Sequence, residues 1–126
     1  MKKGQFKQNG VHLEEHEYNT VKHLLNCGYD IELIPPSDIK GVRSPDVMIN
    51  GNAWEMKAPQ GNGKNTIRNN LKNAGHQSSN IVVDLRRCKL DDEIAVKELY
   101  MHFKVSKRIR RLIIIVNDEK IIDCKK

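Results

Sequence analysis

Aromatic side chains are scarce in this chain of 126 residues, where one Trp, three Tyr and two Phe make up 5% of the sequence. This supply is too small for the base-stacking platforms that many single-strand nucleic-acid binders use. No apolar run approaches the roughly 18 residues of a membrane-spanning helix. The start of the chain, MKKGQFKQNG, lacks the apolar middle of a signal peptide. We therefore expect a charge-rich protein with no membrane span.

Cysteine is also sparse. Cys27, Cys88 and Cys124 are an odd number of widely separated residues, and the sequence contains no CxxC pair. This pattern argues against a disulfide framework and against a cysteine zinc site. It favours reduced thiols in a cytoplasmic setting.

Positive charge, by contrast, is in excess. The 22 Lys and Arg residues outnumber the 16 Asp and Glu residues, which gives a net charge of +6. Such a balance points to a polyanionic partner, with nucleic acid favoured over a membrane surface. The length fits one domain with a real core. We expect residues 1–10 to be a basic linker, or the boundary of a longer protein, and residues 11–126 to be a single monomeric domain.

Hydrophobic periodicity predicts three helices and six strands. The helices cover 11–27, about 66–77 (with Asn65 or Thr66 as the N-cap) and 91–104, and the strands cover 31–35, 46–49, 53–57, 81–85, 112–116 and 120–124. The expected fold is α/β, a mixed central β-sheet flanked by helices in the order α-β-β-β-α-β-α-β-β. The crossover from 53–57 to 81–85 implies a parallel pair in an otherwise antiparallel sheet. Tyr18 and Tyr100 are expected on the buried faces of their helices.

The stretch SPDVMINGNAWEMKAP, residues 44–59, predicts a β-hairpin. Asn50-Gly51 is a strong signal for a type I′ turn, which pairs Val47 with Trp54 and would set Asp46 opposite Glu55. Because side chains alternate along a strand, Glu55 and Lys57 would share a face with Asp46. Two opposed carboxylates destabilise a strand pair unless a cation lies between them. That cation could be Lys57, in a surface salt-bridge ladder, or a divalent metal.

These residues carry a family resemblance. Pro45-Asp46 on one strand and Glu55-Met56-Lys57 on the next resemble the PD-(D/E)XK nuclease core. A closer resemblance covers most of residues 12–123. The wording HExxTVxxLLxxGYDI, SPDVMINGNAWEMKAPxGNGKNTI and NLxxAxxQSxNIVVDLRR is similar to the C-terminal toxin domains of contact-dependent growth-inhibition (CdiA-type) proteins. The resemblance implies a nuclease, usually of tRNA, which acts in the cytoplasm of a target cell and is blocked by a cognate immunity protein.

In such nucleases, paired carboxylates hold one or two divalent ions. The resemblance makes Asp46 and Glu55 the metal ligands, with Mg²⁺ or Mn²⁺ favoured and Zn²⁺ possible, and gives Lys57 the role of assisting at the phosphate. A third carboxylate often comes from the first helix, where Glu17 is preferred to Glu14. The alternative is a Glu at the helix edge that reaches solvent. Gln77 resembles a helix residue beside the metal site, although a chance polar helix end explains it equally well.

Several further residues are candidates for nucleic-acid contacts. The loop GNGKNT, residues 61–66, is not a Walker A motif because Asn65 follows its Lys, but its glycines and the following helix could cradle a phosphate. A plain flexible loop is the alternative. The candidate phosphate-binding residues, which could equally form a solvated surface, are Lys64, Thr66, Arg68, Lys72, Arg86, Arg87, Arg108, Arg110 and Arg111.

Other functions remain open from the sequence. A metal-independent RNase would need acid–base groups, for which His76, Lys57 and Thr66 are available. DNA is an alternative substrate, and a non-catalytic nucleic-acid-binding module is an alternative class. His12, His16 and His23 share one helix face, which is expected to be a solvated polar face and not a zinc site.

Overall fold

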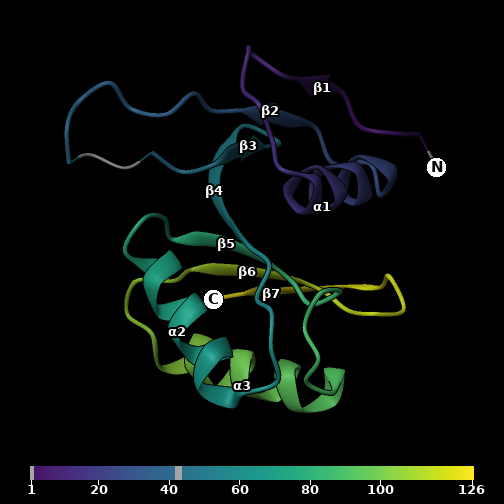
Figure 1. Cartoon of the computed structure of the whole chain (residues 1–126), viewed down its shortest axis with the longest axis vertical. Helices are drawn as coiled ribbons and strands as arrows, with labels where there is room; N and C mark the ends of the chain where they lie inside the picture. Colours follow the sequence, from purple (N-terminus) through teal and green to yellow (C-terminus); the bar gives the residue numbers. More distant parts are fainter. Residues whose placement is uncertain (1, 42–43) are drawn as a thin grey trace. The chain divides into compact units, whose positions relative to one another are not determined.

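The computed structural model describes residues 2–41 and 44–126, and these divide into two compact units at the bond between Trp54 and Glu55. Unit 1 contains β1 (Phe6–Lys7), α1 (Glu15–Asn26), β2 (Ile31–Leu33), β3 (Val47–Ile49) and the first three residues of β4 (Asn52–Lys57). Unit 2 contains the last three residues of β4, then α2 (Lys64–Gly75), β5 (Asn80–Asp84), α3 (Asp92–Val105), β6 (Arg111–Ile115) and β7 (Ile121–Lys125). Figure 1 labels these elements.

In unit 1, strands β1 to β4 pair in the order of the chain. β1 is parallel to β2, and the pairs β2–β3 and β3–β4 are antiparallel. The buried face of α1 consists of Thr20, Val21 and Leu24. Tyr18 was expected on that face but is 50% exposed. Tyr18 lies to one side of the stripe formed by Thr20, Val21 and Leu24, so its side chain points to solvent.

The segment expected to be a linker contains a strand. Of residues 1–10, Met1 lies outside the described residues, while Phe6 and Lys7 form β1 and pair with Ile31 and Glu32. The Gln5 carbonyl accepts a hydrogen bond from the Ile31 N–H at 2.8 Å. The two-residue strand has too little hydrophobic pattern to be recognised in the sequence, because its side chains are both exposed.

Gly4 fixes this segment by close approach. Its N–H donates to the Leu25 carbonyl at 2.8 Å, and a Cβ added to it would overlap the backbone carbonyl of Tyr29. We therefore expect Gly4→Ala to detach β1 from β2. Hydrogen exchange should show at least tenfold faster exchange at the Ile31 amide, whereas Lys3→Ala should leave it unchanged. Slow exchange of the Ile31 amide in Gly4→Ala would contradict the role of Gly4 in holding β1 against β2.

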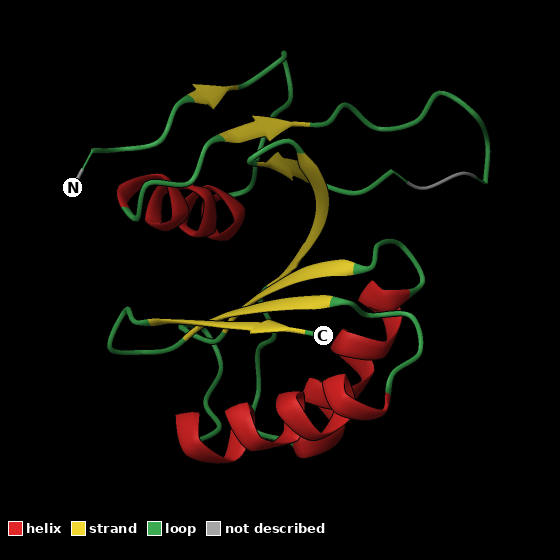
Figure 2. Cartoon of the chain, turned by 180° about the vertical axis from the view of Figure 1, so that it is seen from behind, coloured by secondary structure: helices red, strands yellow, loops and turns green. Residues whose placement is uncertain are grey.

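In unit 2, both helices lie on one face of the sheet, as Figure 2 shows for β5, β6 and β7. The pairs β4–β5 and β5–β6 are parallel, and β6–β7 is antiparallel. The expectation of an otherwise antiparallel sheet was therefore wrong. The helix between 81–85 and 112–116 is itself a crossover connection, which brings its two flanking strands into parallel register.

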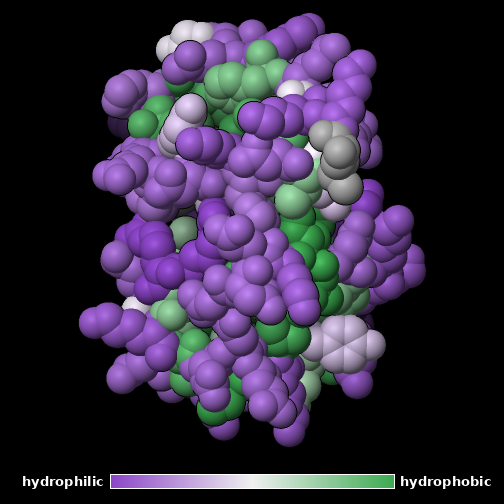
Figure 3. All heavy atoms as spheres, turned by 90° about the vertical axis from the view of Figure 1, so that its right-hand side faces the viewer, coloured by the Kyte–Doolittle hydropathy of each residue, from purple (hydrophilic) through white to green (hydrophobic). Residues whose placement is uncertain are grey.

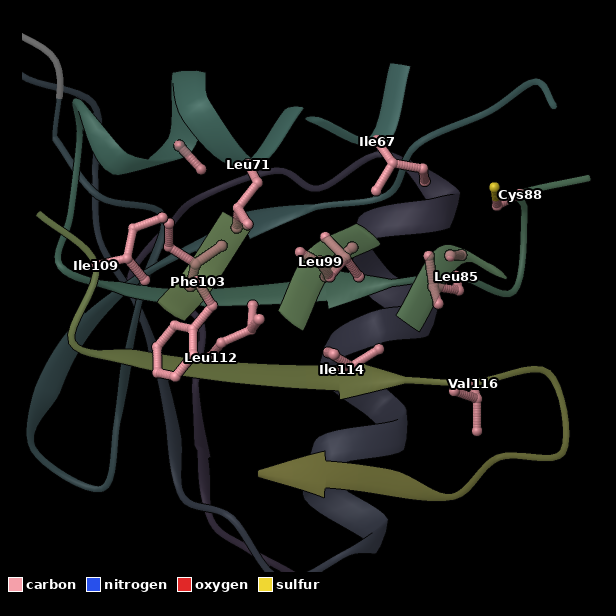
Figure 4. Close-up of a cluster of buried hydrophobic side chains, with 14 residues drawn as sticks. Ile67, Leu71, Leu85, Cys88, Leu99, Phe103, Ile109, Leu112, Ile114 and Val116 are labelled. Carbon is pink, nitrogen blue, oxygen red and sulfur yellow. The ribbon is translucent and has the colours of Figure 1, made fainter. Parts of the chain in front are cut away.

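The core of unit 2 forms between the helices and the sheet, as seen in Figure 4. Its members come from both helices, from the faces of β5 and β6 that the helices cover, and from the segments that flank these strands: Ile67, Leu71, Ala74, Ile81, Val83, Leu85, Cys88, Ala95, Leu99, Phe103, Ile109, Leu112, Ile114 and Val116. Tyr100 was expected in this core but is 47% exposed, because Ala95, Leu99 and Phe103 take the inward positions of α3.

The expected element order is otherwise recovered, with β1 added at its start. The surface in Figure 3 is mainly hydrophilic on the face shown. Within the described ranges, no helix combines the length and apolar character needed to cross a bilayer.

Candidate active site

The predicted hairpin is present in unit 1. Asn50 and Gly51 have φ values of 49° and 88°, as a type I′ turn requires. Val47 pairs with Trp54, so the predicted register is confirmed. The main chain of Asp46 is held on both sides: its N–H donates to the Trp54 carbonyl at 3.1 Å, and its carbonyl accepts from Ile34 at 3.0 Å. Asp46 is thus a half-buried carboxylate on a fixed backbone.

Glu55 and Lys57 begin unit 2. Glu55 is only 3% exposed, and the Lys57 ammonium lies 3.6 Å from its carboxylate. They pair in parallel register with Ile81 and Val83, which both face the helix-covered core. Paired residues of neighbouring strands point to the same face. Glu55 and Lys57 therefore share the face of the sheet on which α2 and α3 pack, as the predicted alternation requires.

A buried carboxylate needs a compensating positive group, since an unpaired buried charge is costly. Lys57 supplies one such group, and its side chain keeps 26% exposure. The ammonium can therefore reach a ligand while remaining near Glu55. The arrangement places the buried carboxylate of Glu55 beside the partly accessible ammonium of Lys57.

Glu17 lies in unit 1 and caps its own helix. Its carboxylate accepts a hydrogen bond from the Glu14 N–H at 3.0 Å, which forms a capping box. Glu17 is half-buried in the first turn of α1, on the same helix face as the buried Thr20, Val21 and Leu24. Donor atoms of Glu14, His16 and Glu17 lie within 4.8 Å of one another. Capping and an ion pair between His16 and Glu14 explain this arrangement.

Gln77 follows α2, which ends at Gly75. Its N–H donates to the Ala74 carbonyl at 2.9 Å, and the residue is half-buried. It therefore lies in the turn that leads into β5, two residues beyond the helix. In unit 2 this turn precedes Ile81, the residue that pairs with Glu55.

The loop before α2 is held in place. Gly61 has a φ of 95°, forms a bridge with Cys88, and accepts a hydrogen bond from the Lys89 N–H at 2.8 Å. These contacts tie the first residue of the loop to the segment that follows β5. The N-cap is Gly63, not Asn65 or Thr66, since the helix begins at Lys64. The first backbone N–H groups of α2 therefore have no capping side chain.

The candidate cations differ in how far their charge is already balanced. Three of them are in ion pairs: Arg68 with Glu98 at 3.3 Å, Arg86 with Asp84 at 2.7 Å and Arg111 with Asp123 at 2.9 Å. Sequence position could not reveal Glu98 or Asp123 as partners, because each lies far along the chain from its arginine. The remaining candidates, which are exposed or half-buried, are the cations Lys64, Lys72, Arg87, Arg108 and Arg110 and the neutral Thr66.

Asp84 was missed by sequence reasoning. It ends the apolar strand β5 and is 4% exposed, and its two oxygens accept from Nε and a terminal nitrogen of Arg86 at 2.9 and 2.7 Å. The signal was an Asp inside IVVDL with an Arg two residues later. This bidentate pair gives Arg86 a structural role, in which it neutralises the buried Asp84 carboxylate at the end of β5.

Two other chemistries receive little support from the geometry. Thr66 lies in the first turn of α2 and His76 at its C-cap, so about 15 Å of helix separates them. They cannot flank one ribose hydroxyl. The cysteines are free thiols, and burial together with the neighbouring Asp123 raises the pKa of Cys124. Its thiol therefore stays protonated near neutral pH and is a poor nucleophile.

Comparisons with known proteins identify the family. The family model described as the contact-dependent growth inhibition CdiA C-terminal domain matches residues 43–121. A CdiA-CT/CdiI toxin and immunity complex from Burkholderia pseudomallei contains a similar structure, with a TM-score of 0.72 and 21% identity over 98% of this chain and 100% of that one. A search of curated proteins found no match. The chain belongs to the CdiA C-terminal domains of contact-dependent growth inhibition, and is a growth-inhibition toxin domain.

Proposed function

We propose that this domain is a metal-dependent endoribonuclease with a PD-(D/E)XK-like core, which cleaves tRNA by phosphodiester hydrolysis. The observation that carries the proposal is the buried Glu55 carboxylate with the Lys57 ammonium 3.6 Å away. Asp46 is the second proposed carboxylate. Its backbone pairs with Trp54, the residue bonded to Glu55 in the chain. The expectation that both carboxylates bind one ion rests on this connectivity.

The donor chemistry fits a divalent ion. Carboxylate oxygens are hard ligands that suit Mg²⁺ or Mn²⁺, and Zn²⁺ is also compatible with them. When bound, such an ion supplies Lewis acidity toward the phosphodiester. Asp46 and Glu55 would hold it, with Glu17 as a proposed third ligand once its capping bond is released.

Lys57 and Gln77 have proposed roles beside the ion. The ammonium of Lys57 can donate hydrogen bonds to a phosphate oxygen and balance the charge that develops there. Its backbone is fixed by pairing with Val83, and its ammonium lies beside the Glu55 carboxylate. The Gln77 amide, in the turn before β5, would orient water or substrate.

The phosphate backbone would contact the start of α2. The uncapped N–H groups after Gly63 and the exposed Lys64 offer an anion site on a loop that is held by Cys88 and Lys89. Lys72 lies two turns farther along the same helix. Since the net charge is +6, a polyanionic substrate is favoured throughout.

We also expect a cognate immunity protein and action in the cytoplasm of a target cell. The similar Burkholderia structure is described as a toxin and immunity complex. An acidic partner that covers Lys57 and the basic residues would complement the charge of this domain. A tight cognate partner with neutral or basic charge would contradict that expectation.

The test is incubation of the purified domain with total tRNA. We expect cleavage in Mg²⁺ or Mn²⁺ and at least about a hundredfold slower cleavage in EDTA, because the carboxylates alone cannot activate the phosphate. Double-stranded and single-stranded DNA serve as parallel substrates. Preferential cleavage of DNA would contradict the ribonuclease assignment, and equal rates in EDTA would contradict the metal requirement.

A further inference from the structure

We infer that unit 2 carries a rigid basic platform for the phosphate backbone of nucleic acid, formed by Lys104, Lys107, Arg108, Arg110 and Lys125. This inference rests on the proposed nuclease function and extends it to a second contact surface. The first four residues come from the end of α3 and the segment leading into β6, and Lys125 is the last residue of β7. The sequence separates Lys125 from the others, so folding is needed to assemble the set.

Backbone hydrogen bonds bring the two segments together. Arg111 pairs with Lys125 in the β6–β7 ladder, and the Lys126 N–H donates to the Arg110 carbonyl at 3.2 Å. The Lys126 ammonium donates to the Ser106 carbonyl and lies 4.9 Å from the Phe103 ring centroid. Figure 2 shows the C-terminus beside the connection between α3 and β6.

The segment that carries Lys107, Arg108 and Arg110 is held firmly. The Ser106 hydroxyl accepts hydrogen bonds from the N–H groups of residues 108 and 109, at 3.2 and 3.1 Å. Ile109 is 3% exposed and belongs to the core, while the Arg110 N–H donates to the Ser79 carbonyl at 2.7 Å. A backbone fixed in this way loses little conformational freedom on binding, and only the exposed side chains have to be ordered.

The charges on the platform are available to a ligand. Lys104, Lys107, Arg108, Arg110 and Lys125 are all exposed, and within residues 2–41 and 44–126 none forms an ion pair with a carboxylate. The nearby Asp123 is engaged with Arg111. With one aromatic ring exposed alongside, Tyr100, the surface suits phosphate contacts more than base stacking.

The platform lies at the same end of the unit 2 sheet as Glu55. The register sets Glu55 beside Ile81 and Leu112, one residue along from the row that contains Arg111 and Lys125. With strands about 4.8 Å apart, three spacings place Lys125 roughly 14 Å from Glu55. Because the two rows are one residue apart, the Lys125 and Glu55 side chains point to opposite faces of the sheet, and the platform is a contact surface separate from the face that carries Glu55.

The test compares two triple variants of equal charge. Lys107→Ala, Arg108→Ala and Lys125→Ala remove the platform, while Lys22→Ala, Lys97→Ala and Lys120→Ala remove three other exposed cations. Binding of fluorescein-labelled total tRNA is measured by anisotropy in EDTA over a range of salt concentrations. Circular dichroism confirms that both variants fold.

We expect the platform variant to bind about 10- to 100-fold more weakly, with a salt slope reduced by about 2, and the control variant to change less than threefold. Equal losses in both variants would overturn the platform as a defined surface. Unchanged tRNA binding, with loss of binding only to vesicles containing phosphatidylserine, would assign the surface to membranes and overturn the inference. Because binding is measured without metal, absence of cleavage by the wild type would refute the proposed function alone.

Discussion

Glu55→Gln should abolish tRNA cleavage, with a loss of at least about a thousandfold, while the domain remains folded. Gln keeps the shape of the side chain but removes the negative charge that would hold a cation. Glu55 is 3% exposed, so no water-accessible carboxylate from solvent can substitute for it at that position. The rate of single-turnover cleavage of total tRNA in Mg²⁺ measures the effect.

Glu98→Gln is the matched control. Glu98 is also a poorly exposed carboxylate in unit 2, with a side-chain exposure of 15%, and it pairs with Arg68 just as Glu55 pairs with Lys57. Its variant should retain activity within about threefold. Asp46→Asn should match the loss seen for Glu55→Gln. Retention of activity by either carboxylate variant would contradict the two-carboxylate site.

Asp84→Ala should reduce the free energy of unfolding by about 3 kcal/mol, the lower end of the range for breaking a buried ion pair. The substitution removes both acceptors of the Arg86 guanidinium and leaves that charge at the end of β5 without its carboxylate. The side chain of Arg86 keeps 24% exposure, which moderates the cost. Urea unfolding monitored by circular dichroism measures the change.

Asp123→Ala provides the comparison. Asp123 also pairs with an arginine in unit 2, but both side chains are about one-third exposed. Solvent screens such a pair, so the expected loss is below about 1 kcal/mol. Replacing Asp84 and Arg86 together by Leu and Met should recover most of the stability, since no uncompensated charge remains. Similar losses for Asp84→Ala and Asp123→Ala would show that burial does not distinguish the pairs.

Local structure was predicted well from the sequence. Asn50-Gly51 specified the turn and hence the register, because few residues adopt positive φ at both central positions. The helix and strand positions in unit 2 followed from hydrophobic periodicity. Tyr18 and Tyr100 were misplaced because periodicity treats them as apolar, whereas smaller neighbours such as Thr20 and Ala95 fill the inward positions.

In the candidate site, the sequence predicted the shared face of Glu55 and Lys57. Glu55 and Lys57 are two residues apart on one strand, so alternation alone places them on one face. Partners distant in sequence could not be found this way. The pairing of Arg68 with Glu98, and of Arg111 with Asp123, depends on how helices and strands pack. Lys125 joins the basic platform only through the β6–β7 register.

The chemical ends of the cleavage products test the central claim most directly. Metal-dependent hydrolysis by Asp46, Glu55 and Lys57 predicts ordinary phosphate and hydroxyl termini, formed only when a divalent ion is present. Attack by the ribose 2′-hydroxyl would instead leave a 2′,3′-cyclic phosphate and would persist in EDTA. Mass spectrometry of tRNA fragments separates these outcomes. Hydrolytic ends that require metal are the predicted result, and cyclic phosphate ends formed in EDTA would contradict the account.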